Sequence, residues 1–183
     1  VGDRLGRRLA SIVIPAHNEA SVIGRCLRSL LKGALPGELE IIVVANGCND
    51  ATYEVAREFG DAVRVLETPA ASKTEALNIG DRTASHFPRF YVDADVQLSI
   101  DAVRETCQLL EKDGVLAASP KLSWDLSRSS LGVKFFYQVW RMQPYFDDGR
   151  LGSGVYALNS EGHKRLQKFP DITADDEYVR QLF

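Results

Sequence analysis

Residues 9–15 read LASIVIP, and this run of apolar and β-branched side chains predicts a buried β-strand. Apolar residues then recur at helical spacing over residues 22–31, and Gly33 stands where that helix should end. A second buried strand is predicted at residues 39–45. A strand, a helix and a further strand in this order indicate an α/β protein built on a parallel sheet.

The alternation of strands and helices continues to residue 119. A helix should run to Phe59 and stop at Gly60, and the capping box from Ser72 to Glu75 should open another. The remaining predicted elements are strands at residues 62–66, 89–93, 115–119 and 155–158, and a helix at about residues 101–112. We therefore expect a mostly parallel central sheet with helices on both faces, of the Rossmann-like, nucleotide-binding type.

The composition is that of one globular domain. The chain has 183 residues, 45% hydrophobic and 26% charged, and its net charge of -3 provides no electrostatic footprint for nucleic acid. Its three cysteines, Cys26, Cys48 and Cys107, form no metal-binding pattern and favour a reducing compartment. No apolar run approaches the ~20 residues of a membrane span. We expect a cytoplasmic protein, and a piece of a longer chain, because no initiator methionine is present.

Polar residues gather where three of the predicted strands end. In parallel sheets, ligands bind beyond the carboxyl ends of the strands. The stretches found there are Pro15-Ala16-His17-Asn18-Glu19, then Asn46 to Asp50, and finally Asp93 to Asp95. We expect these stretches to line one ligand site.

Asp93 and Asp95 are two residues apart, which places both carboxylates on one side of an extended chain. Two anions so close repel each other unless a cation or a shared proton lies between them. A divalent cation such as Mg²⁺ prefers oxygen ligands and can bridge to a diphosphate. The alternative is a turn with two solvated acids.

Lys73 and a second acidic cluster are further candidates. Lys73 falls in the first turn of a predicted helix, where backbone N–H groups and the helix dipole favour a phosphate; the alternative is a solvated surface lysine. Asp175 or Asp176 is a candidate general base that takes a proton from a hydroxyl acceptor. The alternative for these two acids is the acidic first turn of a helix.

Together these pieces resemble the inverting family-two glycosyltransferases, which have the GT-A fold. SIVIPAHNE (residues 11–19) is similar to that family's first strand and nucleotide-binding turn, and KTEALN (73–78) to its Lys-x-x-Ala-Leu-Asn stretch near the donor diphosphate. YVDAD (91–95) resembles the metal-binding Asp-x-Asp, and GSGVYA (152–157) the glycine-rich segment that lines the sugar and acceptor site. The loop ANGCND (45–50) departs from the family's Asp-Asp-Gly-Ser-x-Asp.

The resemblance implies a role for each matching position. Asp95, with Asp93 beside it, would hold a Mg²⁺ or Mn²⁺ ion. Asp176 would be the catalytic base, with Asp175 as the alternative if the register slips by one residue. Asn46 would meet the nucleotide base, since an amide both donates to and accepts from a uracil or guanine edge. The other substrate contacts would come from Pro15, Ala16, His17, Asn18, Glu19, Lys73, Asp93, Gly152, Ser153 and Gly154.

The implied reaction moves a sugar from a nucleoside-diphosphate sugar, with a UDP-sugar favoured, to a hydroxyl acceptor. Residues 1–183 would form one catalytic domain. Its nucleotide-sugar-binding half would span about residues 1–120, and its acceptor-side half, incomplete at the C-terminus, about residues 121–183. Family members make polysaccharides, glycolipids and small glycosides, so peripheral association with the inner face of a membrane stays open.

Three other functions are weighed against this one. An aspartyl-phosphate phosphatase also uses Asp-x-Asp after a buried strand, but it expects that motif at the first strand with the lysine downstream. A sugar-nucleotide pyrophosphorylase would open with a glycine-rich loop and basic residues instead of PAHNE. A non-catalytic nucleotide- or carbohydrate-binding domain is opposed by the retention of Lys73 and both acidic clusters.

Overall fold

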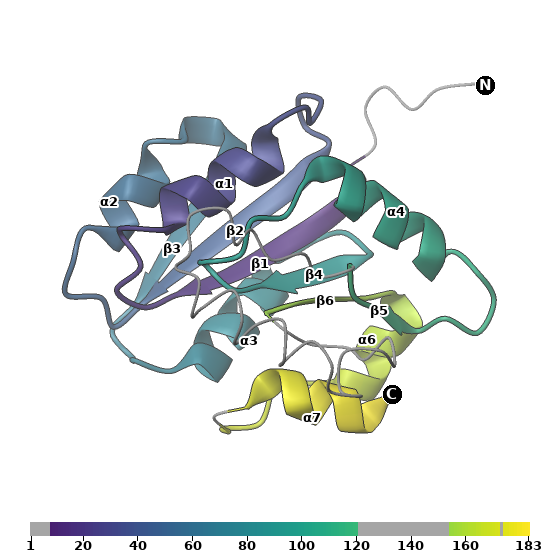
Figure 1. Cartoon of the computed structure of the whole chain (residues 1–183). Helices are drawn as coiled ribbons and strands as arrows, with labels where there is room; N and C mark the ends of the chain where they lie inside the picture. Colours follow the sequence, from purple (N-terminus) through teal and green to yellow (C-terminus); the bar gives the residue numbers. More distant parts are fainter. Residues whose placement is uncertain (1–7, 121–153, 173) are drawn as a thin grey trace, which may run out of the picture.

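The computed structural model describes residues 8–120, 154–172 and 174–183. Within them, six strands form one sheet in the order β3-β2-β1-β4-β6-β5 (Figure 1). The strands are β1 (Ala10–Ala16), β2 (Leu39–Asn46), β3 (Val63–Thr68), β4 (Arg89–Val92), β5 (Ala117–Ala118) and β6 (Val155–Leu158). The helices are α1 (Ile23–Leu31), α2 (Thr52–Arg57), the short 3₁₀ helix η1 (Gly60–Ala62), α3 (Lys73–Thr83), α4 (Ile100–Leu110), α6 (Ser160–Leu166) and α7 (Asp175–Leu182).

Four neighbouring strands are parallel and carry the polar stretches at one edge of the sheet. β1 pairs with β2 on one side and with β4 on the other, and β2 pairs with β3. The register sets Ala16 beside Ala45 and Asn46 beside Thr68. Because parallel strands end at the same edge, the turns after β1, β2 and β4 meet there, as predicted.

The remaining two strands are antiparallel, and the sequence analysis did not predict their direction or order. β6 is antiparallel to both of its neighbours, β4 and β5, and separates them. The strand predicted at residues 115–119 contains only Ala117 and Ala118 in ladder pairing and lies at the sheet edge. Pairing with β6 aligns Tyr91 with Tyr156 and Val92 with Val155, so the end of β4 lies next to the start of β6.

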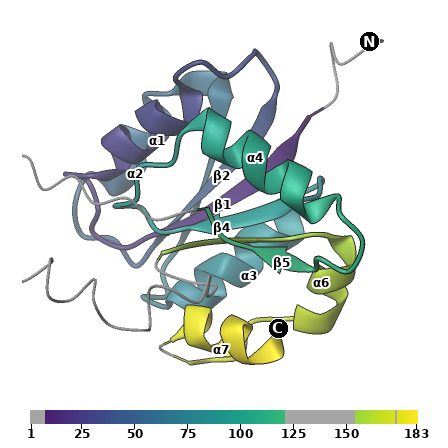
Figure 2. The ribbon, with the colours of Figure 1, turned by 45° about the vertical axis from the view of Figure 1, so that its right-hand side comes forward.

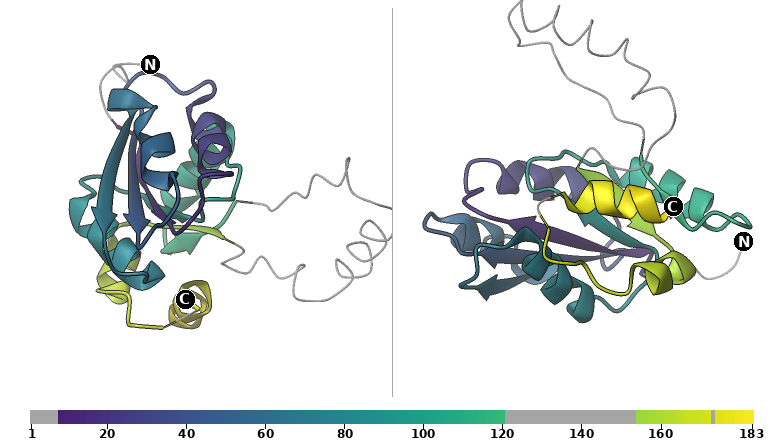
Figure 3. Two further views of the ribbon diagram at one scale, coloured as in Figure 1. Left: turned by 90° about the vertical axis from the view of Figure 1, so that its left-hand side faces the viewer. Right: turned by 90° about the horizontal axis from the view of Figure 1, so that it is seen from below.

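Helices cover both faces of the sheet, which confirms the predicted α/β class. One core cluster joins α1, α2 and α4 to side chains such as Ile12 and Val43. The other joins α3, α6 and α7 to the opposite face of the strands, at side chains such as Val13 and Val44. Figure 2 shows the same two layers from another angle, and the view from below in Figure 3 shows α3, α6 and α7 over one face.

None of the described helices combines the length and the apolar composition needed to cross a membrane. The three cysteines are all unpaired thiols. The expected cytoplasmic location and the division into two halves stay predictions. Residues 121–153, which open the second half, lie outside the described residues.

Candidate active site

Hydrogen bonds join the turn after β1 to the loop after β2. His17 Nδ1 donates to the carbonyl oxygen of Asn46 over 2.5 Å, so its Nε2 is left as an acceptor for the amide of Asn18. Asn18, at a φ of 56°, accepts with Oδ1 from the Asn49 N–H at 2.7 Å. The N–H of Glu19 donates to the Thr52 hydroxyl at 2.7 Å. The turn is therefore a braced structure in which His17 and Asn18 are exposed at the carboxyl edge.

Pro15 and Ala16 differ from the other residues of this stretch. Both belong to β1 and are buried, so their side chains belong to the core. The carbonyl oxygen of Ala16 accepts from the thiol of Cys48 at 3.2 Å. The contact of this pair with the loop after β2 is therefore made by a backbone carbonyl and not by a side chain.

Asn46 ends β2 and is 3% exposed. Its Oδ1 is buried and has no hydrogen-bond partner among the described residues. An acceptor left without a partner away from water is costly, so such an atom calls for an explanation. The next residue, Gly47, has a φ of 58°, and a Cβ there would lie 2.8 Å from the Cα of Ala71. Glycine thus lets this loop approach the segment that leads into α3.

Lys73 contacts Asp93 and Asp175, and these three residues form the junction of the site. It is the first residue of α3, whose N-cap Ser72 accepts from the N–H of Glu75 at 3.2 Å, as the capping box predicted. Lys73 Nζ lies 2.7 Å from Oδ1 of Asp93 and 2.8 Å from Oδ1 of Asp175. One ammonium group therefore connects the start of α3, the end of β4 and the start of α7.

The charged groups of this junction shift one another's pKa values. Burial disfavours the charged form of Lys73, but Asp93 and Asp175 outweigh it and raise the pKa of the lysine. Burial raises the pKa of Asp93, Lys73 opposes the rise, and Asp175 and Asp95 add to it. The carboxylates are thus crowded enough to repel one another despite the shared ammonium group.

The chain bends between Asp93 and Asp95, contrary to the assumption of an extended chain. β4 ends at Val92, and the N–H of Val96 donates to the carbonyl of Asp93 at 3.1 Å, which closes a turn. As a result Asp93 is half-buried and Asp95 is exposed. The two carboxylates still act on one neighbour: burial raises the pKa of Glu19, and Asp95, Asp50 and Asp93 raise it further.

Asp175 and Asp176, although adjacent, have different surroundings. The side chain of Asp175 is 4% exposed, and its two oxygens accept from Lys73 and from the Tyr156 hydroxyl, the latter at 3.2 Å. Asp176 is half-buried, and its Oδ1 accepts from the N–H of Glu177 at 2.8 Å. The structure thus brings Asp175 into the junction and sets Asp176 beside it on α7.

Of the glycine-rich segment, Gly154 is described and lies against the acidic turn. Its carbonyl accepts from the N–H of Asp93 at 2.8 Å. Its φ is 80°, and a Cβ would come within 3.0 Å of Val96 and 3.2 Å of Asp93 Oδ2. A side chain is therefore disfavoured here on both conformational and steric grounds. Gly152 and Ser153 lie outside the described residues.

Two residues of the arrangement were missed by sequence reasoning. Tyr156 was only part of a glycine-rich match, yet its hydroxyl contacts Asp175. Asn78 closes the KTEALN stretch and binds the backbone of Phe169 with both its amide nitrogen and its oxygen, each at 3.0 Å. Asn78 therefore holds the segment before α7. The alternation of side chains along a strand can predict that Tyr156 is buried, but it does not predict which residue its hydroxyl contacts.

The acidic groups suit a divalent cation that is shared with a ligand. No group of three or more His, Cys, Asp or Glu side chains is arranged to hold a metal ion in residues 8–120, 154–172 and 174–183. Mg²⁺ is commonly bound by one or two carboxylates together with substrate phosphates, so a closed protein cage is not required. Asp95, exposed at the turn, and Asp93 beside it provide such oxygen ligands.

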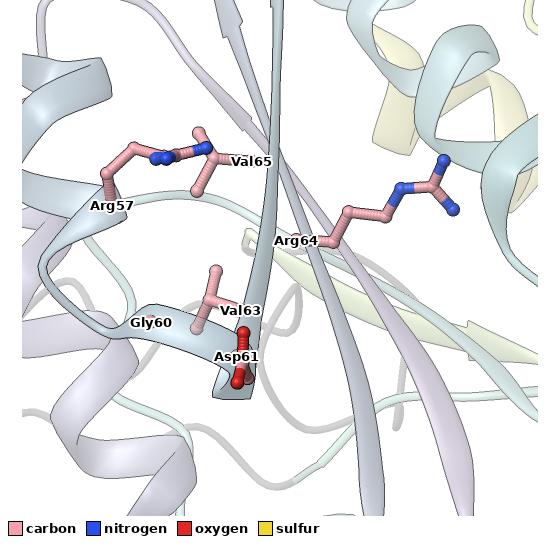
Figure 4. A pocket seen from close by; sticks show the side chains of 6 residues that line it. All are labelled: Arg57, Gly60, Asp61, Val63, Arg64 and Val65. Atoms are coloured by element: carbon pink, nitrogen blue, oxygen red, sulfur yellow. The ribbon is translucent and has the colours of Figure 1, made fainter.

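A surface pocket lies away from this junction, at the start of β3 (Figure 4). It belongs to the opposite edge of the parallel strands, and none of the predicted site residues lines it. The residues around it are Arg57, Gly60, Asp61, Val63, Arg64 and Val65.

The chain matches known glycosyltransferases in sequence. It is 41% identical over 90 residues to the glycosyltransferase AglE of Haloferax volcanii, which covers 46% of this chain and 30% of that protein. It is 30% identical over 118 residues to a 4,4'-diaponeurosporenoate glycosyltransferase of Staphylococcus aureus, which covers 60% of this chain and 31% of the relative. The chain thus spans just under a third of the length of these curated relatives.

Solved structures share the fold. A mannosyltransferase of Pyrobaculum calidifontis, solved with GDP-Man and Mn²⁺, superposes with a TM-score of 0.72 at 24% identity over 98% of this chain and 52% of its own. The glucosyl-3-phosphoglycerate synthase of Mycobacterium tuberculosis, solved with Mn²⁺, UDP and its product, gives a TM-score of 0.62 at 23% identity, over 87% of this chain and 59% of its own.

A family profile matches most of the chain. The sequence profile of Glycosyl transferase family 2 covers residues 11–160, which run from β1 into α6 and include both the acidic turn and Lys73. The chain therefore belongs to glycosyl transferase family 2.

Proposed function

We propose that this chain transfers a sugar from a nucleoside-diphosphate sugar to a hydroxyl acceptor, with inversion at the anomeric carbon. The observation that carries the proposal is the contact of Lys73 with both Asp93 and Asp175. It joins three segments that are distant in sequence into one charged site at the carboxyl edge of the sheet. Family membership and the nucleotide-bound structural neighbours support this choice of donor.

The donor's nucleotide is assigned to the loop after β2. A ring N–H of the base would satisfy the buried Oδ1 of Asn46, which has no partner among the described residues. Uracil and guanine both present such an N–H, and the two structural neighbours were solved with UDP and GDP-Man. The base is therefore tested with both nucleotides.

The diphosphate is assigned to Lys73 and the acidic turn. Lys73 would exchange one of its carboxylate partners for a phosphate oxygen, so that its charge offsets the charge that develops on the leaving group. Asp95 and Asp93 would hold a divalent cation, which when bound supplies further positive charge to the leaving diphosphate.

Asp176 is assigned as the general base. A base needs a carboxylate oxygen that can take a proton from the acceptor hydroxyl. Both oxygens of Asp175 already accept from donors, whereas only Oδ1 of Asp176 is occupied, by a backbone N–H. Deprotonation by Asp176 lets the hydroxyl attack the face opposite the leaving diphosphate, and this attack inverts the anomeric carbon.

A panel of donors tests the proposal without knowledge of the acceptor. UDP, GDP, UDP-glucose and GDP-mannose are titrated calorimetrically with and without Mn²⁺, and nucleoside diphosphate release is followed with water as acceptor. We expect Mn²⁺-dependent binding of one nucleotide class and slow release of that nucleotide. NMR of the sugar released early should detect the β-anomer from an α-linked donor.

The other outcomes of the same panel are equally definite. A generic phosphomonoester is added to the panel, and its hydrolysis without Mn²⁺-dependent nucleotide binding would favour a phosphatase. Nucleotide binding with no release from any donor would favour a non-catalytic binding domain. Release of the α-anomer would refute inversion.

A further inference from the structure

Tyr156 and Asp175 form a buried contact that family membership does not explain. Tyr156 lies on β6, is 2% exposed and faces the layer of α3, α6 and α7. Its hydroxyl donates to Oδ2 of Asp175 at 3.2 Å. Burial, with a further contribution from Asp175, raises the pKa of Tyr156 well above its ordinary value, so the phenol keeps its proton.

The start of α7 receives no hydrogen bond from the side chain of its N-cap residue, Ala174. The two buried residues of α7 are Asp175 at its start and Val179 one turn later. The start of the helix is therefore attached to the body of the protein through the carboxylate of Asp175, which Tyr156 holds from β6 and Lys73 from α3.

We propose that Tyr156 is a positioning residue for the general base. Its hydroxyl holds Asp175, and Asp175 fixes the turn of α7 that presents Asp176 to the acceptor. The role rests on the proposed function, in which Asp176 takes the proton. In this scheme Lys73 exchanges a carboxylate partner for a phosphate oxygen of the donor. The hydrogen bond from Tyr156 to Asp175 then keeps α7 in place.

A second tyrosine provides a matched control. Tyr91 is also 2% exposed, and its ring lies 5.2 Å from that of Tyr156, centroid to centroid. Its hydroxyl donates to Asp81 at 2.6 Å, on α3 and away from Asp175. Tyr91→Phe and Tyr156→Phe therefore each remove one buried phenol hydroxyl that donates to a carboxylate, in the same aromatic pair, and only the second variant affects α7.

The experiment compares the two variants with the 183-residue wild type. Nucleotide release is measured with the donor that the wild type uses, and hydrogen exchange is measured over residues 175–182. A displacement of about 1 Å at a reacting group costs roughly 100-fold in rate. We expect Tyr156→Phe to lower kcat by about tenfold to 100-fold, to change the donor KM by less than about twofold, and to speed exchange in α7. Tyr91→Phe should keep both constants within about twofold and leave α7 exchange unchanged.

Each alternative result has a definite meaning. Equal kcat in the two variants, or a raised donor KM with unchanged kcat in Tyr156→Phe, would overturn the positioning role. Equal exchange of α7 in both variants would refute the attachment itself. Failure of the wild type to release nucleotide from any donor would refute the proposed function, and the exchange data would still judge the attachment separately.

Discussion

The replacement of Lys73 by methionine tests the central junction directly. The variant keeps most of the apolar stem and removes the ammonium group that contacts Asp93 and Asp175. A hydrogen bond to a charged group contributes about 1.5–3 kcal/mol, and the contact with Asp175, which is 4% exposed, should fall in that range. The side chain of Asp93 is 37% exposed, so solvent screens its contact with Lys73, which should add less than about 1 kcal/mol.

We therefore expect Lys73→Met to lower the free energy of unfolding by about 2–3 kcal/mol at pH 7. In a chain of 183 residues this corresponds to a fall of roughly 4–12 °C in Tm. Urea unfolding followed by circular dichroism in EDTA measures the difference. Lys164→Met is the control, because Lys164 is 70% exposed in its pair with Glu161 and should matter by less than about 0.5 kcal/mol.

The pH dependence gives a second check on Lys73. The pKa of Lys73 is raised in the folded state above its ordinary value of 10.5, so its stabilisation is complete below that value and is lost as the pH rises through the raised pKa. On the acid side, protonation of Asp93, whose pKa burial raises, removes one partner of Lys73. The stability difference between wild type and variant should therefore be largest near neutral pH. A variant as stable as the wild type at pH 7, within about 0.5 kcal/mol, would refute the stabilising contribution of Lys73 at this junction.

Three further variants test the remaining assignments. Asp95→Ala should abolish Mn²⁺-dependent nucleotide binding in calorimetry, while Asp113→Ala, an exposed carboxylate elsewhere, should not; retained metal dependence in the first would remove Asp95 from the cation site. Asp176→Asn should bind the donor with nearly unchanged affinity and show no turnover; an active Asp176→Asn beside an inactive Asp175→Asn would move the base by one residue. Burial opposes the charge of Glu40, but hydrogen bonds from serine and histidine neighbours outweigh it and lower its pKa from 4.5 to about 2. The free energy of unfolding of the wild type should therefore fall by up to about 3 kcal/mol as the pH is lowered from 4.5 to 2. Glu40→Gln should lose less stability than the wild type over this pH range, and an equal loss in both proteins would contradict the stabilising contribution of the Glu40 carboxylate.

Much of the fold follows from local patterns in the chain. The run LASIVIP and the second apolar run at residues 39–45 are strands β1 and β2 within one residue at each end. Ser72 caps α3 as its motif predicts, and Gly33 has a positive φ two residues after the end of α1. The second helix was predicted two residues too long, because α2 ends at Arg57 and Gly60 begins η1. Such features depend on neighbours a few residues away, and a single sequence displays them completely.

The geometry of the acidic turn could not be predicted from local sequence patterns. A spacing of two implies carboxylates on the same side only while the chain stays extended, and β4 ends at Val92, before the first of them. After the strand the N–H of Asp93 donates to the carbonyl of Gly154, which belongs to a distant part of the sequence, and the backbone then turns. Asp93 is consequently half-buried against Lys73, and Asp95 is exposed.

The amino-acid sequence alone determined the parallel α/β core, the edge of the sheet at which the polar stretches lie and the residue types gathered there, because hydrophobic periodicity and capping are local properties. The tertiary structure decided the antiparallel insertion of β6 between β4 and β5 and, with it, the meeting of Tyr156, Lys73 and Asp175. These contacts join segments far apart along the chain. They form because buried polar groups must find partners wherever the packing of the sheet and α7 places them.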